Sequence, residues 1–238
     1  MEDITREQLE RNIEDIRSRM NAAALAAGRD PADIRLCAAS KLHDADTVRL
    51  AAQLNIDIFG ENHVQELVAK KAADAYLDKP LHFIGHLQTN KVKQVVGAAE
   101  LIQSVDSDRL LLAIEKQAAK CGIVQDILLE INIGGEESKS GISPEELPAL
   151  LDAAAACEHI RVLGLMAVPP VNTDEQINRG YFAAMKQLFD ACAARQQPRL
   201  EMRWLSMGMS GDFENAIREG ANLVRVGTSI FGARDYSK

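Results

Sequence analysis

The residue best placed to take part in a reaction is Lys41, which follows the short apolar run 35–40. An ammonium group at the end of a buried strand is partly desolvated, which lowers its pKa and frees the amine to attack a carbonyl carbon. The chemistry offered by this position is therefore Schiff-base formation. A solvated lysine at the beginning of a loop is the alternative, and the position alone leaves both open.

Two glycine-containing segments near the end of the chain are suited to binding a phosphate group. Residues 206–212 read Ser-Met-Gly-Met-Ser-Gly-Asp before a helical pattern, and Gly227-Thr228 closes the last apolar run. Glycines let backbone N–H groups approach phosphate oxygens, and a helix amino terminus adds positive potential. Two ordinary tight turns would give the same pattern.

Arg225 lies inside the last apolar run, two residues before Gly227. A guanidinium group stays charged when it is buried, so it must find acceptors. It could form a structural ion pair with Asp212 or Glu61. It could equally face a ligand heteroatom such as a pyridine nitrogen.

Other reactive residue types have plain structural explanations. His82 and His86 flank Gly85, but a strand followed by a turn does not give this pair metal-binding geometry. The cysteines are far apart in the sequence, without CxxC spacing, and we expect reduced, packed thiols and no metal site. These cysteines are Cys37, Cys121, Cys157 and Cys192.

Eight short apolar runs alternate with helical patterns. They are residues 35–40, 56–60, 81–85, 101–105, 127–133, 162–168, 204–207 and 223–227. Apolar strands that are each followed by a helix predict a parallel sheet covered on its faces, and eight such units close into a barrel. A doubly wound open sheet is the alternative, but the first run lacks a glycine-rich dinucleotide turn. In a barrel, chemistry belongs at the carboxyl ends of the strands.

Capping signals place two of the helices. Thr5 and Gln8 form a capping box before an amphipathic segment that Gly28 ends, and Ser143-Pro144 is expected to begin a later helix. The predicted fold is thus α/β, a (β/α)8 TIM barrel with an extra N-terminal helix. We expect residues 1–238 to form one domain.

Composition excludes several classes of partner. The 238 residues carry a formal net charge of -8 and no Lys/Arg cluster, which disfavours nucleic acid binding. No run of 18 apolar residues occurs, and the amino terminus lacks the apolar region of a signal peptide. We therefore expect a soluble, cytoplasmic protein that does not enter membranes.

Taken together, the motifs resemble those of the pyridoxal phosphate homeostasis protein family over nearly the whole length after the first helix. The matching segments are residues 39–41, 59–62, 82–91, 135–141, 164–167, 205–213 and 224–228. The resemblance implies a barrel related to the amino-terminal domain of alanine racemase, with pyridoxal 5'-phosphate (PLP) as cofactor. In it Lys41 matches the Schiff-base lysine and Arg225 the residue facing the pyridine nitrogen. The other implied cofactor contacts are Asn62, Ser206, Met209, Ser210, Gly227 and Thr228.

The resemblance also bears on whether the chain is an enzyme. Two-base racemisation needs a proton donor on each face of the substrate. The chain ends at Lys238, soon after the last run, so we expect no second domain that supplies the opposing base. Arg225 at the ring nitrogen would also weaken the electron sink that PLP enzymes use.

We therefore expect a monomeric carrier with a role in vitamin B6 homeostasis, which delivers PLP to apo-enzymes, with no catalytic residues. In the resemblance, Lys139 matches a loop lysine that is implied in transfer of the cofactor or in a second binding site. A PLP-dependent enzyme such as an amino acid racemase is the first alternative. A phosphosugar aldolase-type barrel is the second.

Overall fold

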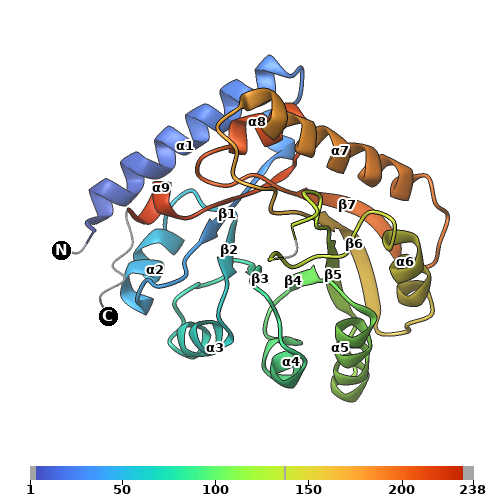
Figure 1. The fold of residues 1–238 in the computed structure, drawn as a ribbon. Coiled ribbons are helices and arrows are strands. Elements are labelled where there is room, and N and C mark those ends of the chain that lie inside the picture. Colours follow the sequence, from blue (N-terminus) through green and yellow to red (C-terminus); the bar gives the residue numbers. More distant parts are fainter. Residues whose placement is uncertain (1–3, 137, 233–238) are drawn as a thin grey trace.

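The computed structural model describes residues 4–136 and 138–232, and within them eight parallel strands close into a barrel (Figure 1). Each strand pairs with the next in sequence, and β1 pairs with β8 to complete the ring. The strands are β1 (Arg35–Ala39), β2 (Ile58–Glu61), β3 (Leu81–Phe83), β4 (Leu101–Val105), β5 (Gln125–Glu130), β6 (Ile160–Met166), β7 (Leu200–Ser206) and β8 (Leu223–Val226).

Helices follow the strands and cover the outside of the ring. They are α2 (Ala45–Ala52), α3 (Val64–Ala72), α4 (Val92–Val95), α5 (Asp108–Cys121), α6 (Leu147–Ala155), α7 (Glu175–Ala193), α8 (Phe213–Arg218) and α9 (Thr228–Phe231), with short 3-10 turns at Pro31–Asp33 and Thr89–Lys91. The extra helix α1 (Arg6–Ala26) packs against α8 and α9 (Figure 1). The predicted TIM barrel with an added N-terminal helix is confirmed.

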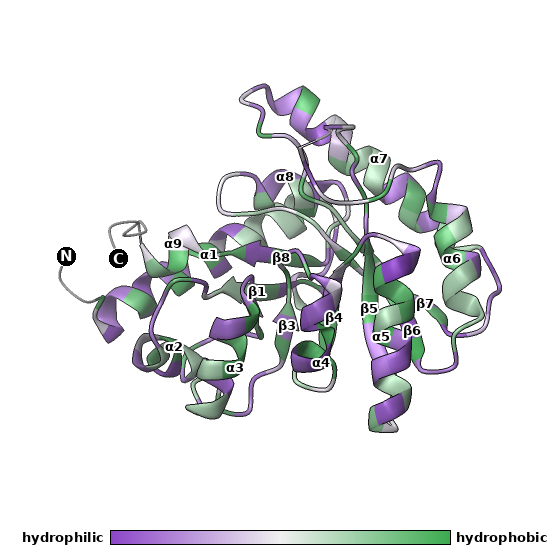
Figure 2. Ribbon diagram, turned by 60° about the horizontal axis from the view of Figure 1, so that its bottom comes forward, coloured by the Kyte–Doolittle hydropathy of each residue, from purple (hydrophilic) through white to green (hydrophobic). Residues whose placement is uncertain are grey.

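The core lies mainly between the barrel wall and the helices, as the apolar strands predict. In β4 and β8 every residue is buried, and Figure 2 shows strands coloured as hydrophobic beside helices with mixed faces. On α1, the side chains of Leu9, Ile13 and Ile16 are almost fully buried. Burial of each such aliphatic side chain stabilises the fold by about 1.5–3 kcal/mol.

One predicted helix start is confirmed and the other is wrong. Thr5 and Gln8 form the expected capping box, and Gly28 follows the end of α1 with φ 67°. However, α6 begins at Leu147, and Ser143 opens a turn closed by a hydrogen bond from Glu146 N to its carbonyl. A helix that began at Pro144 would carry Pro148 in its interior, where proline lacks the required N–H.

Strand ends and cysteines also differ from the sequence predictions. β7 begins at Leu200, four residues before the predicted start at residue 204. The prediction missed this first half because its side chains alternate between exposed and half-buried and form no apolar run. Cys37, Cys157 and Cys192 are buried free thiols, as expected, but Cys121 is exposed at the end of α5. No helix in the described ranges is long and apolar enough to cross a membrane.

Gly164 tests the tight contact between β6 and β7. Its φ is 144°, and a Cβ atom there would lie 1.9 Å from the carbonyl oxygen of Trp204. We expect Gly164→Ala to lower the free energy of unfolding by about 3 kcal/mol, through backbone strain and overpacking. Urea denaturation measures this loss.

Gly180 in α7 provides the matched control, because a Cβ atom there meets nothing within 4 Å. Gly180→Ala should leave stability unchanged or raise it by up to about 1 kcal/mol. Equal stabilities for the two variants would show that the β6–β7 contact does not require glycine.

Candidate functional site

A cavity of about 380 Å³ opens at the carboxyl ends of the strands, where the predicted site residues meet. It is lined by residues of β1 and β8, by residues just beyond β1, β2, β3 and β6, and by the two glycine-containing loops. Of the predicted residues, Lys41, Asn62, Met209, Ser210, Arg225, Gly227 and Thr228 are among its walls, together with Ala39, Ile84, Val168 and Gly211. Ser206 is fully buried below it and is not part of its lining.

Lys41 lies in a turn just beyond β1 and is half-buried. His43 N donates to the carbonyl of Ser40 at 3.2 Å, which closes the turn. The next residue, Leu42, has φ 67°, a left-handed conformation that costs an L-residue about 1–2 kcal/mol. Leu42 N donates to Glu66 Oε2 at 2.7 Å, so the unfavourable conformation is held by a charge-assisted hydrogen bond.

Beneath this turn lies a buried polar cluster that the sequence reasoning missed. Lys70 Nζ donates to the Ser40 carbonyl at 2.7 Å, to Glu61 Oε1 at 2.8 Å and to Glu66 Oε2 at 2.8 Å. Glu61 Oε1 also accepts hydrogen bonds from Ser40 Oγ and Tyr76 Oη. Burial raises the pKa of Glu61, and the Lys70 ammonium opposes that shift. The i, i+4 spacing of Glu66 and Lys70 was the available signal.

The two glycine-containing loops, at residues 206–212 and 227–228, supply further residues to the cavity wall. Ser210 Oγ accepts hydrogen bonds from the backbone N–H groups of Gly227, at 3.3 Å, and Ser229, at 3.5 Å. Met209 N donates to Asp212 Oδ1 at 2.7 Å, which holds the first loop in place. Backbone N–H groups and a hydroxyl that converge in this way are the usual donors for a phosphate group.

Arg225 reaches the cavity from inside the barrel and is buried. Its Nη1 donates to Ser206 Oγ at 2.5 Å and its Nη2 to the carbonyl of Ala167 at 2.9 Å. Arg225 thus binds Ser206 and Ala167 and not Asp212 or Glu61, the two ion-pair partners considered from the sequence. Burial lowers the pKa of the guanidinium, and Cys37, Glu130 and Asp212 oppose the shift. The group still keeps its charge at neutral pH.

A chain of hydrogen bonds continues from Arg225 through the barrel interior. Ser206 Oγ donates to Gln103 Oε1 at 2.6 Å, and Gln103 Nε2 contacts His82 Nδ1 at 2.8 Å. Since an amide nitrogen donates, His82 Nδ1 accepts and its ring proton lies on Nε2. Burial lowers the pKa of His82 to about 3. His82 thus has a structural role, as expected, but its link to Arg225 was not visible in the sequence.

Asn62 supplies a polar atom that the protein leaves unused. Its Oδ1 is buried and has no hydrogen-bond partner among the described residues, although Asn62 lines the cavity. A buried acceptor without a donor is costly and calls for an external partner. This orphaned atom indicates that a ligand with a hydrogen-bond donor belongs beside Asn62.

The remaining predicted loop residues lie at the barrel mouth outside the cavity lining. Lys139 Nζ donates to the carbonyl of Pro169 at 3.0 Å and pairs with Glu136 at 2.8 Å. Ser140 Oγ lies 3.4 Å from Nδ1 of the exposed His86. Glu137, in the same segment, is outside the described residues.

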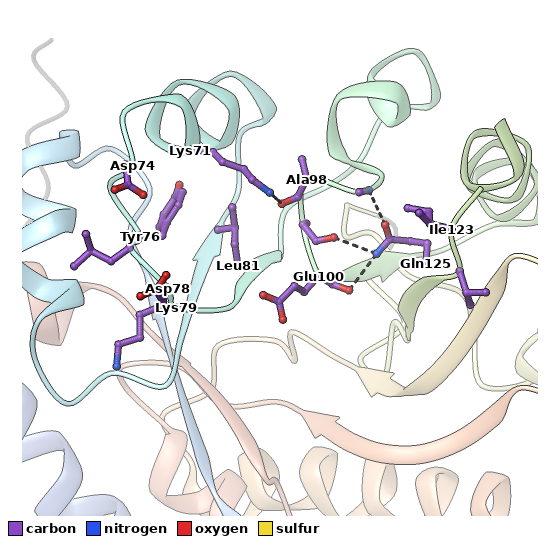
Figure 3. Close-up of a pocket in the computed structure, with 14 residues that line it drawn as sticks. Lys71, Asp74, Tyr76, Asp78, Lys79, Leu81, Ala98, Glu100, Ile123 and Gln125 are labelled. Carbon is purple, nitrogen blue, oxygen red and sulfur yellow. Dashed lines mark hydrogen bonds between the residues drawn. The ribbon is translucent and has the colours of Figure 1, made fainter. Parts of the chain in front are cut away.

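A larger hollow of about 590 Å³ lies at the opposite end of the barrel, beside the amino-terminal ends of β3 and β5 (Figure 3). Several of its polar side chains are already used within the protein. Lys71 Nζ donates to the carbonyl of Ala98, and Gln125 bonds to backbone groups of Gly97, Ala99 and Glu100 (Figure 3). The smaller cavity around Lys41 is therefore the better candidate site.

The barrel is of the class found in the N-terminal domain of alanine racemase. Residues 4–235 match the family model described as alanine racemase, N-terminal domain. The structure of alanine racemase from Clostridium difficile 630 superposes with a TM-score of 0.69 at 13% identity, over 94% of this chain and 61% of that one. This likeness shows a shared fold.

Full-length relatives then give the particular family. The chain is 42% identical to the pyridoxal phosphate homeostasis protein of Aquifex aeolicus, over 97% of this chain and 98% of the relative. It is 31% identical to PipY of Synechococcus elongatus PCC7942, solved with PLP bound, with a TM-score of 0.81 over 94% of this chain and all of that chain (100%). The chain belongs to the pyridoxal phosphate homeostasis protein family.

The low pKa of His82 makes a prediction about stability. An unfolded histidine takes up a proton below about pH 6.5, whereas folded His82 does so only near pH 3. Stability from this group is therefore lost as the pH falls below 6.5. Relative to His82→Gln, the wild type should lose about 2 kcal/mol of unfolding free energy between pH 6.5 and pH 5.

Urea denaturation of both proteins across this pH range provides the measurement. Glu130 has a pKa raised to about 7 by burial, then by Asp106, so its contribution rises as the pH falls from 7 towards its unfolded value. That opposing contribution is common to both proteins and cancels in the difference. Parallel stability curves would contradict the assignment of a neutral, buried His82.

Proposed function

We propose that this protein holds PLP as a Schiff base on Lys41 and takes part in vitamin B6 homeostasis as a carrier. The observation that carries the proposal is that Lys41, Arg225 and the Ser210–Gly227 N–H cradle line one cavity. These three features suit the aldehyde, the pyridine ring and the phosphate of PLP. PLP bound to PipY and the names of the curated relatives support the same ligand.

Each part of the cavity has a separate task in this proposal. Lys41 would hold PLP through an imine to the aldehyde carbon, with the aldehyde oxygen and the two amine protons lost as water. Ser210, Met209, Gly227 and Thr228 would bind the phosphate, and Arg225 would donate to the pyridine nitrogen. Asn62 would accept a hydrogen bond at the rim. We infer that Ser206 acts indirectly, because its hydroxyl holds Arg225.

Two features of the cavity favour a carrier over an enzyme. Among the described lining residues, Lys41 and Arg225 are the titratable ones, so a second acid–base group for the opposite face of a substrate is lacking there. Arg225 also donates rather than accepts, and a ring nitrogen that receives only a hydrogen bond is a weak electron sink. Both features suit storage of PLP without amino acid chemistry.

The wider role follows from the same proposal. A carrier of a reactive aldehyde would pass it to PLP-requiring apo-enzymes, with Lys139 at the mouth of the barrel as the group that assists release. We propose a single-domain, cytoplasmic monomer that acts without nucleic acid or membranes. The alternatives are a PLP-dependent enzyme such as an amino acid racemase and a phosphosugar aldolase-type barrel.

Replacement of Lys41 tests the covalent attachment. Wild-type protein mixed with PLP should show an imine absorbance band, and borohydride should fix the label on a peptide containing residue 41. Lys41→Ala should abolish both signals, because no other amine lines the cavity in the described structure. Lys93→Ala, which removes an exposed lysine of α4, is the matched control.

Turnover assays separate the alternatives. Racemisation, cleavage or transamination of amino acids by the PLP-loaded wild type would show that the protein is an enzyme rather than a carrier. A sugar phosphate, rather than PLP, trapped on Lys41 would support the aldolase-type barrel. A PLP label on other lysines alone would contradict the proposal.

Ser210 tests the phosphate cradle. Ser210→Ala should weaken PLP binding by about tenfold, since a hydrogen bond to a charged group contributes roughly 1.5 kcal/mol. Binding of pyridoxal, which lacks the phosphate, should not change. Spectroscopic titration of both ligands measures the difference, with Ser18→Ala, at an exposed position of α1, as the control. Equal losses for both ligands would place the phosphate elsewhere.

A further inference from the structure

The buried cluster beneath Lys41 contacts the chain on both sides of that residue. On one side, Lys70 Nζ binds the carbonyl of Ser40, the residue before Lys41. On the other side, Glu66 Oε2 binds the N–H of Leu42, the residue after it. Lys70 and Glu66 also form an ion pair with each other at 2.8 Å. One ion pair therefore binds both of the residues that flank Lys41.

Lys70 is an unusual residue in this position. Its side chain is only 6% exposed, and its three hydrogen bonds go to Ser40, Glu61 and Glu66. Buried ion pairs often stabilise a fold no better than apolar residues of similar size, because both charges lose their water. Packing of α3 against the barrel would therefore not require a lysine at position 70.

The backbone of the turn explains what the ion pair adds. Leu42 has a left-handed conformation that favours glycine, yet the turn is held by Glu66 through the Leu42 N–H. Because this conformation fixes the direction in which the chain leaves Lys41, its loss would redirect the side chain at the cavity wall. The cluster thus constrains the backbone on both sides of Lys41, and with it the position of the amine.

We propose that Lys70, with Glu66, is a positioning residue that aims Lys41 into the cavity by clamping the peptide groups on either side of it. The proposal rests on the proposed function, since it assigns these residues to the imine-forming step. Preorganised placement of a reacting group speeds its reaction, and a misplacement of about 1 Å can cost about a hundredfold.

Lys70→Met tests the clamp by removing the ammonium while keeping most of the side-chain volume. Imine formation with PLP should slow by about tenfold or more, and the induced circular dichroism of the bound chromophore should fall, because the amine is no longer fixed. Lys71→Met is the matched control. Lys71 is the next residue of α3, but its Nζ binds the carbonyl of Ala98 at the other end of the barrel (Figure 3).

A pair of Glu66 variants keeps the test decisive even if Lys70→Met fails to fold. Glu66→Gln retains an oxygen acceptor for Leu42 N–H, whereas Glu66→Met does not, and both remove the charge. Glu66→Gln should keep most of the wild-type rate and chromophore dichroism, while Glu66→Met should lose both. Far-UV circular dichroism and thermal unfolding establish that each variant is folded.

The outcomes separate this inference from the proposed function. Wild-type rates and chromophore dichroism in folded Lys70→Met and Glu66→Met would overturn the clamp and leave Lys41 attachment intact. Equal losses in the two Glu66 variants would also overturn it, because the acceptor would then be irrelevant. A wild-type protein with no trapped imine would overturn the proposed function, and the clamp with it.

Discussion

Closure of the barrel is the constraint on which the site depends. Because β1 pairs with β2 on one side and with β8 on the other, the turn with Lys41 and the loop with Gly227 emerge from neighbouring strand ends. A Cβ atom at Gly227 would lie 2.9 Å from the Ala39 carbonyl, which shows how closely the two ends pack. An open sheet would leave β1 and β8 apart, and the cavity would lack a wall.

A closed ring also determines how polar groups inside it must be arranged. A buried donor or acceptor is costly unless it is hydrogen-bonded, so polar groups inside the ring must pair with one another. Arg225, Ser206, Gln103 and His82 meet this need as a single chain in which every group donates in the same direction. The orientation of the guanidinium at the cavity is therefore coupled to residues deep in the barrel.

The two polar systems of this protein act on different ends of the ligand that we propose. The chain through the interior holds Arg225, whereas the cluster of Lys70, Glu61 and Glu66 holds the backbone around Lys41. Neither system places a second acid–base group among the described residues of the cavity lining. Binding a reactive aldehyde firmly and leaving its chemistry idle are both consistent with this arrangement.

The sequence by itself determined the barrel, the extra helix and the candidate residues at the strand ends, because hydrophobic periodicity, capping residues and family motifs are local signals. It did not determine the start of α6, where Pro148 overrides the Ser143 cap, or the burial of Ser206 beneath the cavity. Only the tertiary structure decided that His82 is linked to Arg225 and that Lys70 binds the peptide group before Lys41. Such contacts join residues from different strands and helices, and their geometry depends on barrel closure rather than on any local pattern of residues.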